Sequence, residues 1–219
     1  MSVASFDVEA AVAAVAAADP LLGALISRAG PFEPRPGTGD YFASLARSIM
    51  FQQLAGHAAV AIHTRFVAAL GGSVNPTSVL AATPEALRMA GLSANKSAAI
   101  MDLALKATDG TLPLDTLDQL DDEDIIKRLS QVRGIGRWTA EMFLLFELRR
   151  PDVWPVGDYG IRNGWTLIHS LPALIAPRVL QAEGERFRPY RSVAAWYCWR
   201  AVGMFRKDMV LPDALPGSG

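Results

Sequence analysis

The sequence predicts an all-α protein, because helical signals recur along almost the whole chain and no clear alternating strand is present. Capping residues stand where helices would begin, and glycine or proline stands where many of them would end. The nearest candidate for a strand, Val153-Trp154, is very short. The expected helices, roughly ten, cover 7–18, 40–54, 57–70, 84–90, 94–108, 122–131, 137–148, 159–170, 176–187 and 190–205.

In the first half of the chain, composition and apolar spacing carry the helix signals. An alanine-rich composition favours a helix over 7–18. Apolar residues three and four positions apart predict the helices over 40–54 and 57–70, and two consecutive glycines end the second of them. A Thr-Pro-Glu sequence that starts at Thr83 supplies a capping residue and then a proline in the first turn of the next helix.

In the second half, capping residues and breakers carry the signals. Ser93 can cap the helix over 94–108, and Asp121 can cap the helix over 122–131. The segment 137–148 is strongly apolar on one side, and a proline shortly after it ends the helix. Two further helices fit the pattern that follows, and the last predicted helix is rich in aromatic residues.

Size and composition indicate a globular protein with a substantial core, since 51% of the 219 residues are hydrophobic. The longest run of small apolar residues, Ala10 to Ala18, is too short to span a bilayer. No Lys or Arg precedes Arg28, so a secretory signal peptide is disfavoured. The single cysteine, Cys198, excludes an internal disulfide and a cysteine-bound zinc or iron–sulfur cluster, and it fits a cytoplasmic protein.

The net charge of −1 is unusual for a nucleic-acid-binding protein, but the charge is unevenly distributed. Residues 1–130 hold 9 basic and 14 acidic side chains, whereas residues 131–219 hold 12 basic and 8 acidic ones. This asymmetry is compatible with a basic nucleic-acid-binding surface and equally with ordinary solvated helix faces. Several arginines fall close to the motifs described next: Arg133, Arg137, Arg149, Arg150 and Arg162.

The segment Gln131–Phe146 (QVRGIGRWTAEMFLLF) has the pattern of two helices joined by a Gly-Ile-Gly hairpin. Bare N–H groups in the hairpin and the positive end of the second helix would together bind one anion, most plausibly a phosphate. A dinucleotide-binding fingerprint is excluded, because Thr139 occupies the third glycine position and the preceding segment is helical rather than a strand. A tight helix–helix turn without a ligand remains the alternative.

A single acidic residue, Asp158, follows twelve residues after this segment, in Pro155-Val-Gly-Asp-Tyr-Gly160. Breaking an N-glycosidic bond leaves positive charge on the sugar, and a fixed carboxylate can stabilise that charge or orient the attacking water. Asp158 also stands where an N-cap of the next helix would stand, and the two roles are compatible.

These motifs resemble the signature of the helix–hairpin–helix DNA glycosylases. LSQVRGIGRWTAEMFLLF resembles the hairpin of that family, and PVGDYGIR resembles its loop with the catalytic aspartate. Two weaker stretches agree, Ile49–Leu54 (IMFQQL) and Arg188–Trp199. The set is most similar to the 3-methyladenine DNA glycosylase II branch, and the resemblance runs from about Tyr41 to Arg206.

The resemblance implies an enzyme of base excision repair that flips an alkylated purine, such as 3-methyladenine, out of double-stranded DNA and removes it by hydrolysis. Bifunctional members carry a Schiff-base lysine where this chain has Trp138, so a monofunctional reaction without lyase chemistry is expected. No cofactor is required, and an iron–sulfur cluster is not expected. The chain shows no trace of the N-terminal β-rich lobe of the best-known member.

The resemblance also assigns site residues. The catalytic residue is Asp158, and the base pocket comprises Trp138, Met142, Tyr159 and Trp199. The expected DNA-binding residues are Gly134, Gly136, Arg137 and Thr139 at the hairpin, with Gln52, Gln53 and Leu54 as candidates to fill the gap that the flipped base leaves. A structural Na⁺ or K⁺ would be held by the backbone carbonyls of Ser130, Val132 and Ile135. For each aromatic residue the alternative is a place in the core, and for Gln52–Leu54 it is a polar helix end with a core leucine.

The expected organisation is one compact unit, which acts as a monomer and has no membrane partner. One lobe would cover about 41–150 and include the hairpin region 122–148, and the other would combine about 1–35 with 155–219, so that the hairpin and Asp158 meet at a DNA-binding cleft. Two alternatives remain: a non-catalytic helix–hairpin–helix module that binds damaged or distorted DNA, and an all-α protein without a DNA role.

Overall fold

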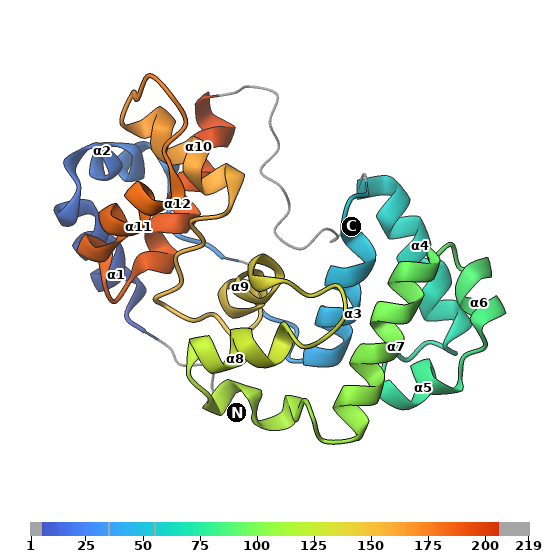
Figure 1. Ribbon diagram of the computed structural model, residues 1–219. Coiled ribbons are helices and arrows are strands. Elements are labelled where there is room, and N and C mark those ends of the chain that lie inside the picture. Colours follow the sequence, from blue (N-terminus) through green and yellow to red (C-terminus); the bar gives the residue numbers. More distant parts are fainter. Residues whose placement is uncertain (1–5, 35, 55, 206–219) are drawn as a thin grey trace. The chain divides into compact units, whose positions relative to one another are not determined.

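The computed structural model describes residues 6–34, 36–54 and 56–205, and this part of the chain is helical with no strand (Figure 1). The prediction of an all-α fold is therefore confirmed. The α-helices are α1 (Val8–Ala18), α2 (Pro20–Ala29), α3 (Tyr41–Phe51), α4 (Gly56–Ala69), α5 (Pro76–Ala81), α6 (Pro84–Met89), α7 (Ala94–Thr108), α8 (Asp122–Leu129), α9 (Arg137–Phe146), α10 (Tyr159–Ile168), α11 (Pro177–Gly184) and α12 (Arg191–Phe205). Two short 3₁₀ helices complete the set, η1 (Leu114–Gln119) and η2 (Glu185–Phe187). None of these helices is both long enough and apolar enough to span a membrane.

The helices form two compact units. Within the described residues, unit 1 comprises 6–37 and 144–205, and unit 2 comprises 38–143. Helix α9 crosses the division, because its last three residues belong to unit 1. Each unit has its own buried core and is described by itself.

Unit 1 is built around the contact between α10 and α12, against which α1 and α2 also pack (Figure 1). The first two helices, α1 and α2, therefore lie beside the last one, α12. Gly164 of α10 lies so close to the backbone carbonyl of Cys198 that a side chain at this position would clash with it. Trp154, Trp165 and Phe187 pack edge to face or tilted against one another in the same core. This core holds α10, and therefore its first residue, in a fixed place.

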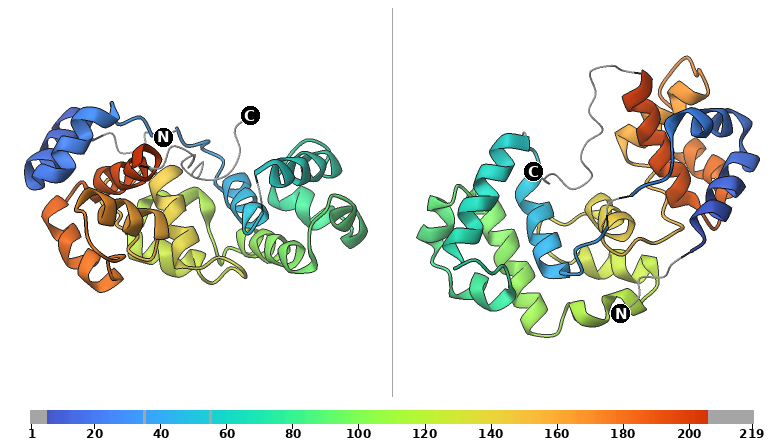
Figure 2. Two further views of the ribbon diagram at one scale, coloured as in Figure 1. Left: turned by 90° about the horizontal axis from the view of Figure 1, so that it is seen from above. Right: turned by 180° about the vertical axis from the view of Figure 1, so that it is seen from behind.

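Unit 2 is built around α3 and α7, which lie side by side, and α7 also packs against α5 and α6 (Figure 2). The inward faces of the two central helices are apolar, and Leu45, Ile49, Ile100 and Leu103 are almost completely buried. Burial of such side chains stabilises each by about 1.5–3 kcal/mol relative to exposure. The end of α3 and the face of α7 are consequently rigid supports for the loops that adjoin them.

Two α-helices and one 3₁₀ helix were missing from the sequence prediction. Helix α2 was missed because Asp19 is both the C-cap of α1 and the N-cap of α2, so a single residue separates two helices. Helix α5 was missed because Asn75 and Pro76, which cap and begin it, have the composition of a turn and the helix has only six residues. Segment 114–119, which forms η1, had been left without a predicted element.

Several helices were also predicted too long at their C-terminal ends. Helix α3 ends at Phe51, α8 at Leu129, α9 at Phe146 and α10 at Ile168. The segment predicted as one helix over 176–187 is divided into α11 and η2. Val153-Trp154 lies in an irregular segment rather than a strand. The predicted helices ran two or three residues past these ends, because the last turn of a helix frays and the sequence marks its end less sharply than a capped start.

Candidate active site and nucleic-acid interface

In unit 1, Asp158 is a buried carboxylate at the N-terminus of α10, and its side chain is only 8% exposed. The predicted N-cap is confirmed, because the N–H of Ile161 donates to Oδ1 of Asp158 at 2.8 Å. The Nε1–H of Trp199 donates to the same oxygen, also at 2.8 Å. A carboxylate in this position is stabilised by two fixed donors and by the positive end of the helix.

Trp199 reaches Asp158 because the residue between them on α10 is a glycine. A Cβ at Gly160 would lie 2.7 Å from Cδ1 of Trp199 and 3.1 Å from Oδ1 of Asp158. The indole also lies against Phe146, whose ring centroid is 5.5 Å away with a tilt of 32° between the planes. Trp199 and Phe146 also line a hollow in unit 1, together with Phe32, Arg149, Arg150 and Trp196.

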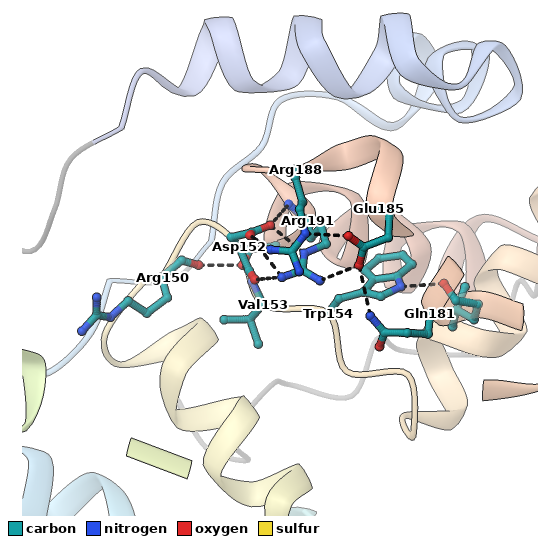
Figure 3. A network of polar contacts seen from close by, with 10 residues as sticks. Arg150, Asp152, Val153, Trp154, Gln181, Glu185, Arg188 and Arg191 are labelled. Atoms are coloured by element: carbon teal, nitrogen blue, oxygen red, sulfur yellow. Dashed lines mark hydrogen bonds and ion pairs between the residues drawn. The ribbon is translucent and has the colours of Figure 1, made fainter. Parts of the chain in front are cut away.

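A network of charged and polar contacts holds the loop that leads from α9 to Asp158 (Figure 3). Arg191 donates from Nε to Oδ1 of Asp152 at 2.6 Å, and Arg188 donates from Nη1 to Oδ2 of Asp152 at 2.7 Å. Ser192 both donates to the carbonyl of Arg150 at 2.6 Å and accepts from the N–H of Val153 at 2.9 Å. The loop is thus tied to the start of α12, the helix that also carries Trp199.

In unit 2, the hairpin between α8 and α9 has the geometry that its glycines predict. Gly134 has φ of +79°, a conformation that favours glycine, and its Cα faces Ala99 on α7, where an added Cβ would lie 3.3 Å from the alanine Cβ. Gly136 has open space around it. Its N–H and those of the next residues belong to the first turn of α9, where intrahelical acceptors are lacking. The hairpin can therefore accept an anion at its exposed side.

Among the predicted DNA-binding residues, Arg137 and Thr139 are already engaged within unit 2. The guanidinium of Arg137 donates to both carboxylate oxygens of Glu123 and to Glu141, and its hydrogen bonds to Glu123 raise the pKa of Arg137. Thr139 is buried, and its hydroxyl oxygen lies 3.5 Å from Nε2 of Gln52. Much of the charge of Arg137 is balanced inside the protein.

The residues expected to form the base pocket are divided between the two units. Trp138 and Met142 lie on α9 within unit 2, and Tyr159 and Trp199 belong to unit 1. Trp138 and Tyr159 are 50% and 57% exposed, which is unusual for large aromatic side chains, whereas Met142 and Trp199 are buried. The rings of Trp138 and Tyr159 thus face solvent, whereas Met142 and Trp199 pack in the cores of their units.

The candidates for filling the DNA gap lie just after α3. Gln52 donates from Nε2 to the carbonyl of Gly134 at 2.9 Å, so its amide is bonded to the hairpin. Gln53 is exposed and has φ of +58°, a left-handed conformation that non-glycine residues seldom adopt. The N–H of Leu54 donates to the carbonyl of Phe51, and its side chain is half-buried.

The sequence-based prediction missed Lys96 and Asp102, two residues of α7 that contact these loops. Nζ of Lys96 donates to the carbonyls of Met50 and Gln52, and Oδ2 of Asp102 accepts the N–H of Arg133 at 2.8 Å. It also missed Gly160 and Phe146 as neighbours of Trp199. Nothing in the local pattern marks these residues, because each contact joins segments far apart in the chain.

The residues expected to hold a monovalent cation, Ser130, Val132 and Ile135, occupy the hairpin. The Val132 carbonyl accepts the N–H of Ile135 at 3.0 Å, which leaves one of its two lone pairs for another partner. In the described part of the chain, no cluster of three or more His, Cys, Asp or Glu residues could hold a metal ion. Backbone carbonyls remain the candidate ligands.

Comparison with known proteins identifies relatives that match most of this chain. Residues 46–189 match the family model described as HhH-GPD superfamily base excision DNA repair protein. DNA-3-methyladenine glycosylase 1 of Schizosaccharomyces pombe is 36% identical over 162 residues, which cover 73% of this chain and 71% of the relative. DNA-3-methyladenine glycosylase 2 of Escherichia coli is 30% identical over 77% of this chain, and the match spans 60% of that protein's length.

Two solved structures are similar along most of their length. A DNA-3-methyladenine glycosidase from Bacillus halodurans has a TM-score of 0.84 and 33% identity, and the match covers 95% of this chain and 94% of the other. The Schizosaccharomyces pombe 3-methyladenine DNA glycosylase in complex with abasic DNA has a TM-score of 0.77 and 33% identity, with coverage of 87% and 95%.

Proposed function

The chain belongs to the HhH-GPD superfamily of base excision DNA repair proteins, and from this premise we propose that it is a DNA glycosylase that removes alkylated purines, such as 3-methyladenine. The observation that carries the proposal is the buried carboxylate of Asp158, fixed by two donors at a helix N-terminus. The names of the relatives support the same class of substrate.

In the proposed reaction, the bond between C1′ of the deoxyribose and the purine nitrogen breaks, and its electron pair leaves with the base. A water molecule then supplies the oxygen that bonds to C1′, and its proton passes to the Asp158 carboxylate or to bulk water. Positive charge develops on the sugar as the bond breaks, and the Asp158 carboxylate stabilises it or orients the water. An alkylated purine is cationic or electron-poor, so it leaves readily, and one acidic residue is enough.

The base must leave the duplex before it can reach Asp158. We assign the exposed rings of Trp138 and Tyr159 to stacking on the flipped base, because electron-rich rings attract electron-poor purines. The hairpin N–H groups around Gly136 hold a backbone phosphate, and the loop Gln52–Leu54 fills the gap. The protein acts as a monomer on damaged double-stranded DNA.

Hydrolysis without lyase chemistry is the further part of the proposal. Trp138 occupies the position that holds a Schiff-base lysine in bifunctional relatives, and an indole cannot form such an intermediate. Borohydride treatment during turnover should therefore trap no covalent protein–DNA adduct. Appearance of a trapped adduct would assign the protein to the bifunctional class.

We also propose a structural Na⁺ or K⁺ at the hairpin, held by the carbonyls of Ser130, Val132 and Ile135, and an action in the bacterial cytoplasm. The supporting observation for the cation is that the ligands are backbone oxygens in the same turn that binds the phosphate. The supporting observation for the compartment is the single buried thiol of Cys198.

The decisive experiment measures release of free base from methylated duplex DNA by the wild-type protein and by Asp158→Asn. Asparagine caps helices about as well as aspartate, so folding should be retained, while the rate should fall by at least about 100-fold with loss of the charge. Asp7→Asn is the matched control, because Asp7 caps α1 by the same kind of contact, at 3.0 Å to the N–H of Ala10.

Asp7→Asn should release base at the wild-type rate. Equal turnover by wild type and Asp158→Asn would remove Asp158 from the mechanism. Binding of damaged DNA with no release by either protein would instead favour a non-catalytic helix–hairpin–helix module.

A further inference from the structure

The side chain of Lys96 closes the C-terminal end of α3. From the first turn of α7, Nζ donates to the carbonyl of Met50 at 2.6 Å and to that of Gln52 at 2.7 Å. The last carbonyls of an α-helix have no intrahelical partners, and a cation near them is favourable. The side chain of Lys96 is half-buried, and this burial lowers the pKa of its ammonium group.

The loop that begins at this helix end is fixed at two points and exposed at its tip. Lys96 binds its first carbonyl, that of Gln52, while the amide of Gln52 donates to the carbonyl of Gly134 in the hairpin. The next residue, Gln53, projects into solvent in a left-handed conformation. Such a conformation costs on the order of 1–3 kcal/mol and persists only where the surroundings impose it.

Helix α7, which carries Lys96, also supports the hairpin. Asn95 accepts from the guanidinium of Arg133 at 3.1 Å, and Asp102 accepts the N–H of the same arginine at 2.8 Å. Ala99, between them on the helix, lies against Gly134. Residues three, four and seven positions apart share one face of a helix, so one rigid element holds both the loop and the hairpin. Figure 2 shows α3 and α7 side by side, with the loop following the end of α3.

We propose that Lys96 is a positioning residue, which fixes the loop Gln52–Leu54 relative to the hairpin so that Gln53 enters the gap left by a flipped nucleotide while the hairpin holds the phosphate. This rests on the proposed function. A loop that is already ordered loses little conformational entropy when it enters the DNA stack, whereas a loose loop would lose much more. Lys96 should therefore matter for DNA that has a gap and matter little for intact DNA.

The test compares equilibrium binding to two duplexes of the same sequence, one intact and one with a stable tetrahydrofuran abasic-site analogue. Lys96→Met keeps the length of the side chain and removes the donor. Its preference for the abasic duplex should fall about tenfold from the wild-type value, with affinity for intact duplex changed by less than about threefold. Lys96→Arg should restore most of the preference, because it keeps a charged donor.

Lys127→Met is the matched control, since Lys127 is an exposed lysine of α8 in the same unit. Loss of its charge can lower both affinities equally, so the ratio between the two duplexes should not change. Thermal unfolding checks that each variant is folded. If Lys96→Met does not fold, Gln52→Met removes the other fixed point of the loop, and the same fall in preference is expected.

An unchanged preference in folded Lys96→Met, or in Gln52→Met if that variant takes its place, would overturn the proposal. A wild-type protein that binds both duplexes equally would overturn it as well, because the loop would then fill no gap. Neither measurement requires turnover, so failure of the proposed glycosylase reaction is detected separately, as absence of base release from methylated DNA.

Discussion

At the scale of single residues, the contact between Trp199 and Asp158 depends on the absence of a side chain at Gly160. The indole N–H is used on the carboxylate, and one side of the ring faces Phe146, so this tryptophan orients the acid whatever it contributes to the base pocket. Any side chain at Gly160 would stand between the two. Gly160 of α10 and Trp199 of α12 therefore set the orientation of the Asp158 carboxylate together.

Gly160→Ala should displace the indole, because the new methyl group would lie within 3 Å of two of its atoms. Loss of a hydrogen bond to a charged group corresponds to about 1.5–3 kcal/mol, so base release under single-turnover conditions should slow by roughly 10- to 100-fold. Gly157→Ala is the control, since Gly157 has open space and does not require a left-handed backbone. Equal rates for both variants would show that the Trp199 contact does not support catalysis.

At the scale of secondary-structure elements, several helices end with a residue in the left-handed conformation. Helix α2 ends at Ala29 and is followed by its C-cap, Gly30, with φ of +84°, where glycine is at no disadvantage. After α10 the C-cap is His169, and the next residue, Ser170, has φ of +50°. The N–H of Leu171 returns to the carbonyl of Thr166 at 3.0 Å. The serine is tolerated there at an energetic cost.

Ser170→Gly should raise the free energy of unfolding by about 0.5–1 kcal/mol, because glycine adopts this conformation without steric conflict. Urea denaturation at constant m-value measures the change. Ser170→Ala retains a Cβ and should give no such gain. A gain of equal size in both variants would mean that the serine hydroxyl, rather than the backbone conformation, is the unfavourable feature.

A second element-scale feature joins the start of α2 to the end of α10 through a buried hydrogen bond. Asp19 caps α2 by accepting the N–H groups of Leu21 and Leu22, each at 3.0 Å, and its Oδ2 lies 2.9 Å from Nε2 of His169. The ring of His169 stacks on Trp165 with centroids 4.0 Å apart. Burial alone raises the pKa of Asp19, but these backbone and histidine partners outweigh it and hold the pKa below the ordinary value of 3.8.

A carboxyl group with a lowered pKa in the folded state stabilises the protein above its unfolded-state pKa and loses this effect as the pH falls through the folded-state value. Asp19→Asn should therefore cost about 1–3 kcal/mol of unfolding free energy near pH 6, and the difference from wild type should shrink below pH 3.8. Denaturant titrations of both proteins at several pH values measure it. A difference that is the same at pH 6 and pH 3 would exclude the ionised carboxylate as its source.

At the scale of the whole molecule, the excess of basic over acidic residues in 131–219 attracts DNA less strongly than the residue count implies. Arg137 is paired with Glu123 and Glu141, and Arg188 and Arg191 are paired with Asp152. Basic side chains that are paired with neighbouring acidic side chains attract DNA only weakly at a distance. Affinity for DNA should depend more on the hairpin N–H groups than on a general basic surface.

Gly136→Asp tests this dependence, because position 136 has room for a side chain and the new charge would face the phosphate. Affinity for duplex DNA should fall, and the slope of log K against log salt should become shallower by about 1. Gly136→Asn has the same shape without the charge and should retain most of the affinity. If Gly136→Asp binds DNA as wild type does, with the same salt dependence, the Gly-Ile-Gly turn is only a packing feature.

Features encoded within a few residues were predictable from the sequence alone. The all-α fold, the hairpin with its left-handed Gly134 and the N-cap at Asp158 each depend on local spacing, caps and backbone freedom, which neighbouring residues determine. The same local rules missed α2, since Asp19 ends one helix and begins the next. A prediction that relies on a loop between consecutive helices cannot detect two helices that are separated by a single residue.

Only the tertiary structure decided which distant side chains meet. The Trp199–Asp158, Gln52–Gly134 and Lys96–Met50 contacts join segments 41, 82 and 46 residues apart. A tryptophan or lysine in an amphipathic helix has the same local pattern whether it fills the core or orients a functional group. Its partner is chosen by the packing of whole helices, and packing depends on the shapes of all the buried side chains together. The sequence by itself thus determined the parts of this protein, and the close packing of its helices determined how the parts within each unit act on one another.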